Sequence, residues 1–446
     1  YNSRFGQNIQ TGLFSKVLMG AYDVQNTYLN VLGIYTNTTQ VDAYRGAGRP
    51  EAIYLLERMM DRAARELNID PLELRRINFI KKESFPYRSS TGEMIDVGDF
   101  DRVLTAAEIS ADIKGFEQRK KESEAKGRLR GLGLCYYIES ILGDPSEEAK
   151  VVFEEDGSVK IFVGTQSNGQ GHETVFAQFL SDQTGIPTEK IIVVQGDSDL
   201  IPRGGGTGGS RSVTVQNNAT LATVEKIIQS FSQYLSEKLE VDVEDIGFDD
   251  TSFRIKGSNY SPNVLEVAKM ACEDLRFDLL KHSAKATLDA RSFPNGAHFA
   301  EVEVDPETGF VQVVKYCVVD DFGNLINPML AEGQVHGGVA QGIGQALYEN
   351  VVYDQEGQLL TATFMDYGIP RAQDLPYYKF ETECVPSTAN IMGMKGCGEA
   401  GTVGALAAVA NAVQDALWGF GIQQVDMPFT SEKIWSMINS GKLAAE

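Results

Sequence analysis

The sequence has few residues that hold metals directly. Among its 446 residues are four histidines and five cysteines, and no two cysteines form a C-x-x-C pair. Such scattered positions do not match zinc or iron–sulfur spacing, and a chain of this length does not need disulfides. We therefore expect a reducing compartment, the cytoplasm, and no metal bound by protein side chains. Any metal would have to arrive on an organic cofactor.

Basic residues and long apolar runs are also scarce. Lys and Arg number 40 against 62 Asp and Glu, which gives a formal net charge of -22. This charge argues against nucleic acid as a partner, because phosphate backbones bind basic surfaces. No apolar run approaches the roughly 18 residues of a membrane span, and no charged-then-apolar leader opens the sequence. We expect a soluble protein without a membrane span.

Alternating and helical patterns predict an α+β fold. Residues 149–163 alternate across Asp156-Gly157 and residues 300–319 alternate around Gly309, so each segment predicts a β-hairpin. A short strand is expected at 191–194. Helical patterns occupy about 50–67, 173–182, 215–239, 333–348 and 402–417.

A short pattern occurs twice and predicts two similar lobes. Gly-Gln-x-His stands at 169–172 and again at 333–336, each time at the expected start of a helix. So short a pattern can also recur by chance.

Two other segments are less regular. Residues 112–130 are charge-rich and predict a linker or an exposed helix. Residues 28–35 alternate like a strand that has no nearby partner.

Four segments embed polar side chains among glycines: 167–173, 204–212, 337–344 and 393–401. Backbone N–H groups and hydroxyls at helix starts bind phosphate well. None of the four is a Walker loop, and no dinucleotide fingerprint follows a strand. Each loop alone is typical of turn chemistry. Together they indicate a large, phosphate-bearing cofactor that several loops wrap.

The last of these loops contains a single carboxylate, Glu399, just before the helix expected at 402–417. Two interpretations follow from its position. An acid at a helix start can simply cap the helix. Alternatively, the surrounding glycines allow a cofactor or substrate to approach the carboxylate closely.

Five ordered motifs resemble those of the molybdenum hydroxylases, the family of the molybdenum-binding subunits of xanthine dehydrogenase and aerobic carbon monoxide dehydrogenase. The motifs are A-Y-R-G-A-G-R-P-E (43–51), G-Q-G-H-E-T (169–174), T-G-G-S-R-S (207–212), G-Q-V-H-G-G-V-A-Q-G-I-G (333–344) and M-K-G-C-G-E-A-G (394–401). The resemblance runs from about Tyr22 to the last helices. It implies that residues 1–130 end a first molybdenum-binding domain. Residues 131–446 would form a second molybdopterin-binding domain with lobes at about 131–297 and 298–446.

The resemblance also implies roles for individual residues. Glu399 matches the family's catalytic base, and a base must lie within hydrogen-bond reach of the proton that it takes. Arg45, Gly46 and Ala47 would form the active-site loop. The cofactor would be molybdopterin, a molybdenum pyranopterin, in its cytosine dinucleotide form. The residues implied to bind it are Gly169, Gln170, Gly171, His172, Thr207, Gly208, Gly209, Ser210, Arg211, Ser212, Gln341 and Lys395.

Three positions depart from named members of the family. Gly46 stands where carbon monoxide dehydrogenases carry the cysteine that binds copper, so the copper-dependent reaction is not expected. Ala47 stands where xanthine enzymes place a phenylalanine that stacks on the purine. Leu13 aligns with an arginine of those enzymes. The sequence therefore does not favour a purine as substrate.

The resemblance covers the C-terminal half of the usual molybdenum subunit. We expect a partner chain that carries the N-terminal half, unless the sequence is a fragment, together with a ferredoxin-like iron–sulfur subunit and an FAD subunit. The expected function is hydroxylation of an aromatic N-heterocycle or an aldehyde, with water as the oxygen source. A cofactor-free scaffold or assembly subunit with the same fold is the alternative, and a phosphate- or nucleotide-binding enzyme without molybdenum is a second one.

Overall fold

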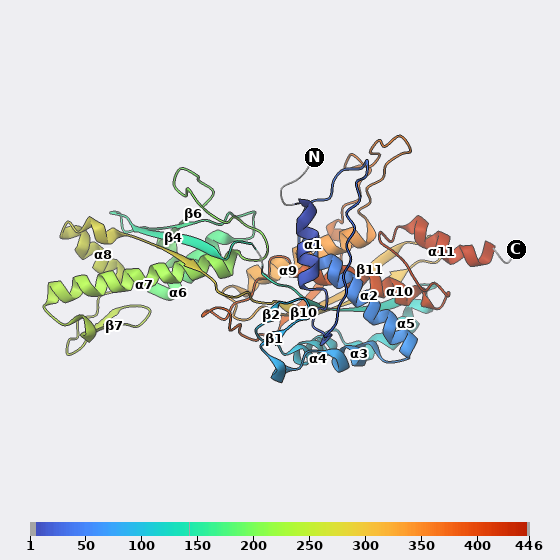
Figure 1. The fold of residues 1–446 in the computed structure, drawn as a ribbon, viewed down its shortest axis with the longest axis horizontal. Coiled ribbons are helices and arrows are strands. Elements are labelled where there is room, and N and C mark those ends of the chain that lie inside the picture. Colours follow the sequence, from blue (N-terminus) through green and yellow to red (C-terminus); the bar gives the residue numbers. More distant parts are fainter. Residues whose placement is uncertain (1–5, 142, 444–446) are drawn as a thin grey trace.

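A computed structural model describes residues 6–141 and 143–443 as two lobes (Figure 1). The small lobe is built on a sheet of strand order β6-β5-β4-β9, and the large lobe on a sheet of order β12-β11-β10-β3. The strands are β1 (Tyr87–Arg88), β2 (Met94–Ile95), β3 (Leu129–Ile138), β4 (Ser146–Phe153), β5 (Val159–Val163), β6 (Ile191–Val194), β7 (Ile246–Phe248), β8 (Phe253–Ile255), β9 (Lys281–Thr287), β10 (Asn295–Val304), β11 (Val311–Asp321) and β12 (Tyr378–Thr382).

The helices divide into three groups. Those of the N-terminal part are α1 (Gly6–Lys16), α2 (Arg49–Leu67), α3 (Pro71–Asn78), α4 (Phe100–Ser110) and α5 (Phe116–Glu124). Those of the small lobe are α6 (His172–Thr184), α7 (Ser212–Leu239) and α8 (Val264–Glu273). Those of the large lobe are α9 (Pro328–Leu347), α10 (Ala400–Trp418) and α11 (Ser431–Leu443).

The two lobes share one topology. Each runs hairpin, helix, strand, helix, as β4-β5-α6-β6-α7 in the small lobe and β10-β11-α9-β12-α10 in the large lobe. In both sheets the last of these strands lies parallel to its neighbour, and the other pairings are antiparallel. The α+β class with two similar lobes is therefore confirmed, and the hairpins predicted at 149–163 and 300–319 are present.

The boundary between the two sheets does not fall where the sequence predicted a boundary between the lobes. Strand β3, at 129–138, pairs with β10 over its whole length and so belongs to the large lobe's sheet. The predicted division at 297/298 falls inside β10. The reason is that the chain enters the large lobe first, leaves it to build the small lobe from 146 to 287, and then returns. A linear pattern gives no sign of such a return.

Helix α10 is the packing centre of the large lobe. Nearly all of its residues are buried, which confirms the buried helix expected at 402–417. It lies so close to β3 that a Cβ on Gly133 would come within 2.0 Å of the Ala408 carbonyl oxygen. Helix α2 and helix α9 pack on α10 as well, so α10 connects the N-terminal part to the glycine loop 393–401 that precedes it.

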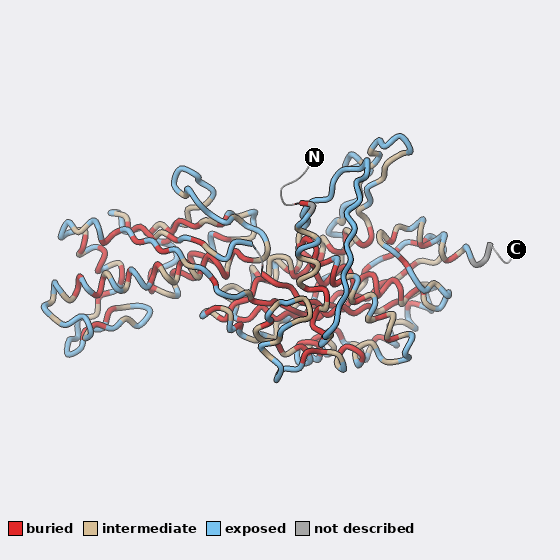
Figure 2. Tube along the Cα trace, in the orientation of Figure 1, coloured by how far each residue is buried: buried red, intermediate tan, exposed pale blue. Residues whose placement is uncertain are grey.

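Three local predictions need correction or completion. Helix α9 begins at Pro328 and not at 333, so the second Gly-Gln-x-His pattern lies inside a helix while the first precedes one. The charge-rich segment 112–130 is no linker: it contains α5 and the first residues of β3. Residues 28–35 are extended but join no sheet, and they belong to a largely exposed stretch, 23–43 (Figures 1 and 2).

Candidate active site

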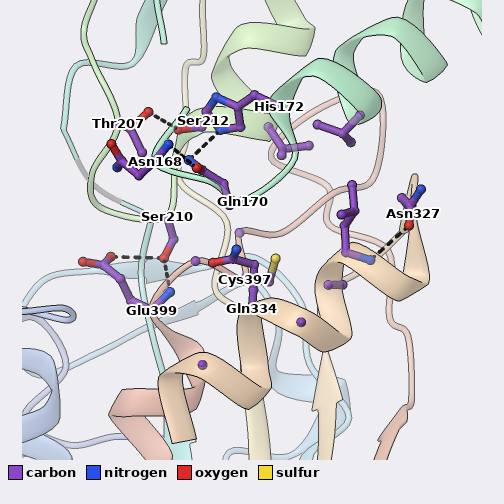
Figure 3. A pocket seen from close by; sticks show the side chains of 18 of the residues that line it. Asn168, Gln170, His172, Thr207, Ser210, Ser212, Asn327, Gln334, Cys397 and Glu399 are labelled. Carbon is purple, nitrogen blue, oxygen red and sulfur yellow. Dashed lines mark hydrogen bonds between the residues drawn. The ribbon is translucent and has the colours of Figure 1, made fainter. Parts of the chain in front are cut away.

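A cavity of about 700 Å³ lies where the two lobes meet. The N-cap Asn327 of α9 lines it, and three further helices begin at it, namely α6, α7 and α10, so the positive ends of their dipoles point into one space. A glycine-rich segment precedes each of the helices α6, α7 and α10, and side chains from these segments face the cavity (Figure 3). The fourth glycine segment, 337–344, lies within α9 and lines the cavity through Gly337 and Gln341. The structure thus brings together all four segments.

Arg45 connects the N-terminal part to the cavity wall. Its Nε donates to the Gly398 carbonyl at 2.7 Å, and its Nη1 donates to the Gln341 side chain at 2.9 Å. Its Nη2 donates to the side chain and the carbonyl oxygen of Gln334, at 2.8 and 3.0 Å. Because these donors are engaged within the protein, Arg45 holds the loops in place around the cavity.

Glu399 is the N-cap residue of α10, yet its side chain makes no capping bond. The carboxylate instead accepts from the Gly46 N–H at 3.0 Å, from the Ser210 hydroxyl at 3.1 Å and from the Arg49 guanidinium. Burial alone would raise the pKa of Glu399, but Arg49 and the Gly46 and Ser210 donors outweigh it and hold the pKa below its usual range. A helix-capping role does not explain these contacts, whereas a fixed, ionised carboxylate at the cavity wall does.

Two residues of this centre were not singled out from the sequence. Arg49, the first residue of α2, is 1% exposed and binds both Glu399 and a second carboxyl group, Glu139. Glu139 follows the apolar strand β3 and is fully buried. In the sequence, Glu139 was marked only as an acid after a mostly apolar segment. Arg49 belonged to the motif 43–51, which was interpreted as a loop.

The small lobe contributes neutral donors to the cavity. Gln170 and His172 lie 3.0 Å apart, Nε2 to Nε2, and Thr207 and Ser212 lie opposite them (Figure 3). Burial lowers the pKa of His172, so its ring is neutral, and its buried Nδ1 has no protein partner. An unsatisfied buried ring nitrogen costs free energy unless a ligand or water meets it.

The glycines of this wall leave space that the protein does not use. A Cβ added to Gly169 or Gly208 would meet no atom within 4 Å. Packing within the chain therefore does not require these glycines to lack side chains, although the backbone φ of +102° at Gly169 itself favours glycine. Together with the neutral donors and the helix N-termini, this open space fits a large anionic group such as a pyranopterin with its phosphates.

Four of the predicted site residues lie elsewhere or face away. The Arg211 guanidinium is buried in an ion pair with Glu147 at 2.7 Å, so it does not reach the cavity as a phosphate ligand. Lys395 borders the cavity, but its Nζ is buried against Asp321 at 2.5 Å. Both side chains hold a loop in position. Gly46 and Ala47 do not line the cavity; Gly46 contributes its backbone N–H to Glu399.

The remaining predicted residues are placed as follows. Gly171 adopts the left-handed conformation at the start of α6 and packs against Leu330. Gly209 and Ser210 line the cavity with Thr207, Gly208 and Ser212. Within residues 6–141 and 143–443, no three His, Cys, Asp or Glu side chains gather as they would around a metal ion. No helix of that described part has the length and apolar character to cross a bilayer.

Comparison with family models agrees with a cofactor-binding role for this cavity. A model described as a molybdopterin cofactor-binding domain matches residues 106–376, and a second one of the same description matches residues 1–79. These two matches together include the Arg45 loop and the small-lobe wall of the cavity.

Individual proteins match over nearly the whole chain. The carbon monoxide dehydrogenase large chain of Hydrogenophaga pseudoflava is 33% identical over 453 residues, covering 97% of this chain and 56% of that protein. The nicotine 6-hydroxylase large subunit of Paenarthrobacter nicotinovorans is 35% identical, covering 93% of this chain and 53% of that protein. Quinoline 2-oxidoreductase from Pseudomonas putida 86 superposes with a TM-score of 0.91 at 31% identity, covering 97% of this chain and 57% of that structure.

The chain therefore spans little more than half the length of the relatives that it matches. The family matches agree with the cavity, in which neutral donors and glycines converge from both lobes. The chain belongs to the molybdopterin-binding molybdenum hydroxylase family.

Proposed function

We propose that this chain is the cofactor-binding, base-bearing part of an oxidoreductase that hydroxylates an electron-poor carbon with oxygen from water. The observation that carries the proposal is Glu399, a carboxylate that is ionised, fixed by three donors and exposed to the cavity on one side. A general base needs this combination of fixed geometry and an unprotonated state at neutral pH. Glu399 would accept the proton that a water-derived nucleophile releases.

The cofactor proposed for the cavity is molybdopterin in its cytosine dinucleotide form. When bound, it would supply a molybdenum centre that accepts two electrons from the substrate. Gln170 and Ser212 would donate to its polar groups. The backbone N–H groups at the starts of α6 and α7 would meet phosphate oxygens.

The substrate class follows from the Arg45 loop. A Cβ on Gly46 would lie 2.4 Å from Pro50, and its φ of +106° disfavours any side chain. A copper-binding cysteine would not fit there without movement, which argues against oxidation of carbon monoxide. We propose an aromatic N-heterocycle or an aldehyde, and two of the relatives are named for nicotine and quinoline, which are both aromatic N-heterocycles.

A further polypeptide segment, on a partner chain or in a longer form of this one, would supply the part of the relatives' length that this chain does not match. The exposed stretch 23–43 supports this proposal, because its residues 28–35 are extended, join no sheet and are mostly apolar: Leu32 and Ile34 are 73% and 75% exposed, and Tyr35 is 92% exposed. An open strand edge with exposed apolar side chains is a ready surface for another chain. The Thr39 hydroxyl and the Tyr353 hydroxyl, 3.0 Å apart, join the end of the stretch to the loop that follows α9.

Replacing Leu32 and Ile34 by aspartate should abolish co-purification of the partner while the lobes stay folded. The matched control replaces the nearby polar Asn37 by aspartate and Gln40 by glutamate, which adds the same charge without removing apolar surface. Retention of the partner by the first variant would place the interface elsewhere. An iron–sulfur subunit and an FAD subunit would complete the electron path in the cytoplasm.

Glu399→Gln tests the proposed function. Cofactor should stay bound, since the amide keeps the shape of the side chain, but turnover should fall by about 10²–10⁴-fold because no base remains. Molybdenum analysis of the purified complex measures the first effect, and a screen of N-heterocycles and aldehydes measures the second. A complex without molybdenum, or equal turnover by the variant, would instead favour a cofactor-free scaffold or assembly subunit.

A further inference from the structure

Two carboxyl groups in the candidate active site share one guanidinium. Arg49 donates through Nη1 to Glu139 at 2.8 Å and through Nη2 to Glu399. Its remaining contacts are to the carbonyl oxygens of Gly46 and Ser140, both at 2.7 Å. No other cationic side chain contacts either carboxyl group within the described chain. If both carboxyl groups were ionised, two negative charges would be bonded to the single positive charge of Arg49, with Arg45 acting on them only from a longer distance.

Burial makes that state costly. Glu139 and Arg49 are 0% and 1% exposed, and the Glu399 side chain is 14% exposed. An unpaired charge in such surroundings loses its hydration without compensation, and a group so placed takes up a proton instead. One of the two carboxyl groups must therefore hold a proton more strongly than the other.

The hydrogen bonds identify which one. Glu399 has a backbone donor of its own, the Gly46 N–H at 3.0 Å, in addition to Arg49. Glu139 receives no backbone N–H, and its buried Oε2 has no partner at all. Carboxylates with more donors are the better anions, so the proton belongs on Glu139.

Ser210 lies between the two carboxyl groups and can serve only one of them as donor. Its Oγ is 2.5 Å from Glu139 Oε1. The same Oγ is 3.1 Å from Glu399 Oε2 and accepts the Glu399 N–H at 3.0 Å (Figure 3). A protonated Glu139 would donate to Ser210 Oγ, which would leave the hydroxyl hydrogen for Glu399. This arrangement satisfies every short contact of the serine.

We propose that Glu139 is a positioning residue that holds a proton while Glu399 is ionised, so that Arg49 and the Ser210 hydroxyl both stabilise the Glu399 carboxylate. The inference rests on the proposed function, in which Glu399 is the base, and adds the residue that sets its protonation state. Without the proton on Glu139, the two carboxylates would compete for one guanidinium and one hydroxyl.

Of the other ionisable groups near Glu139, Arg45 is cationic and attracts both carboxyl groups through space, but it makes no hydrogen bond to either. Arg45 is engaged with Gly398, Gln334 and Gln341 on the far side of Glu399. Burial raises the pKa of Cys397 to about 12 and raises that of Tyr137 well above its usual value, so both are neutral. Burial likewise raises the pKa of Glu139, to about 8, with Arg49 opposing the rise and the charge of Glu399 adding to it.

Infrared titration of the purified complex tests the proposal without requiring turnover. A protonated carboxyl group has a C=O stretch separate from that of a carboxylate. Incorporating ¹³C-labelled glutamate distinguishes Glu139 from the buried Asp320, whose pKa burial also raises. The wild type should show one glutamic acid band at neutral pH that disappears as the pH rises past about 8. Glu139→Gln should lack this band.

Glu399→Gln should also lose the band at neutral pH. With only one carboxylate left beside Arg49, the centre is charge-balanced and Glu139 ionises. The matched control, Glu147→Gln, removes a buried carboxylate of the Arg211 pair and should leave the band unchanged.

Two results would overturn the proposal: no titrating glutamic acid band in the wild type, or a wild-type band that shifts at once in D₂O, because a proton on Glu399, which is 14% exposed at the cavity, would exchange faster than one on the fully buried Glu139. Loss of the band in Glu139→Gln alone does not locate the proton, since the remaining carboxyl group would ionise beside Arg49 in either case. Absence of hydroxylase activity with the expected bands present would contradict the proposed function alone.

Discussion

Helix α2 contributes to two buried ionic centres that differ in charge balance. At its first residue, Arg49 faces two carboxyl groups, Glu139 and Glu399. Two turns later, Glu57 faces one guanidinium, that of Arg75, at 2.8 Å. Both centres are buried, and both join α2 to distant parts of the chain. Only the first borders the cavity.

The balanced centre is fully satisfied. Glu57 accepts from Arg75 Nε at 2.9 Å, from the Tyr136 N–H at 2.9 Å and from the Tyr22 hydroxyl. The centre at Arg49 instead has one carboxyl group too many and an oxygen, Glu139 Oε2, without a partner. Such an imbalance does not stabilise a buried ion pair, because two carboxyl groups then share one guanidinium. The difference teaches that the charge balance and an acceptor oxygen without a donor, rather than burial, separate a reactive centre from a structural one.

The largest difference between the centres should appear when the same change is made in both. Glu57→Gln leaves Arg75 buried without a counter-charge and turns an amide N–H towards existing donors, so the free energy of unfolding should fall by about 3–5 kcal/mol. Glu139→Gln replaces a protonated acid by a neutral group of the same shape and should change it by less than about 1 kcal/mol.

Equilibrium unfolding followed by tryptophan fluorescence measures both variants, because Trp418 and Trp435 both lie in helices of the large lobe. Glu57 and Glu139 also pack in that lobe or on it. Equal losses in the two variants would contradict the distinction between a balanced and an unbalanced centre.

The second test uses pH. Glu139 has a pKa of about 8 in the folded chain and an ordinary value of 4.5 when exposed. Between these values the folded state binds a proton that the unfolded state has lost, so the free energy of unfolding should decrease as pH rises from about 4.5 to about 8. Glu139→Gln should remove this slope.

Glu399 changes the free energy of unfolding in the opposite direction and over a different pH range, because its pKa is lowered. Its contribution to stability is present above its ordinary value of 4.5 and is lost as pH falls below that value. The two carboxyl groups can therefore be told apart by the pH range alone. An unchanged slope between pH 4.5 and 8 in Glu139→Gln would show that another group takes up the proton.

Part of this centre was predictable from the sequence. The glycine loop 393–401 and the helix after it identified Glu399, because a lone acid among glycines at a helix start is a local signal. Arg49 and Glu139 were not found, because they meet Glu399 from 350 and 260 residues away and nothing in their own neighbourhoods indicates the contact. For the same reason the pattern assigned Arg211 to a phosphate, although Glu147 neutralises it.

The fold shows the same division between local and distant information. The hairpins and the helix pattern at 215–239 depend on neighbouring residues and were predicted within a few positions. The strand β3 was not predicted, and its residues were placed with the small lobe, because its position depends on its pairing with β10, more than 150 residues later. Sequence patterns therefore predicted elements and motifs, whereas the contacts that unite them required the structure.

A third test separates the two carboxyl groups by moving Ser210. A Cβ on Gly396 would lie 2.1 Å from the Ser210 carbonyl oxygen and 2.8 Å from its Cβ. Gly396→Ala should therefore shift Ser210, cost about 1–3 kcal/mol of stability and weaken the infrared band of Glu139. Gly398→Ala is the matched control, because its Cβ would meet Ser210 only at 3.5 Å, an ordinary contact. Similar losses in both variants would contradict this role for Ser210.

The smallest effect is expected at an ion pair that is neither buried nor unbalanced in charge. Lys269 and Glu273 lie one turn apart on α8, 3.9 Å from each other, and are 78% and 64% exposed. Water already solvates both groups, so Lys269→Gln should change the free energy of unfolding by less than about 0.5 kcal/mol. Because this pair lies in the small lobe, chemical denaturation should be followed by circular dichroism. A loss comparable to that of Glu57→Gln would mean that ion pairing itself, and not its burial and charge balance, accounts for the difference between the centres.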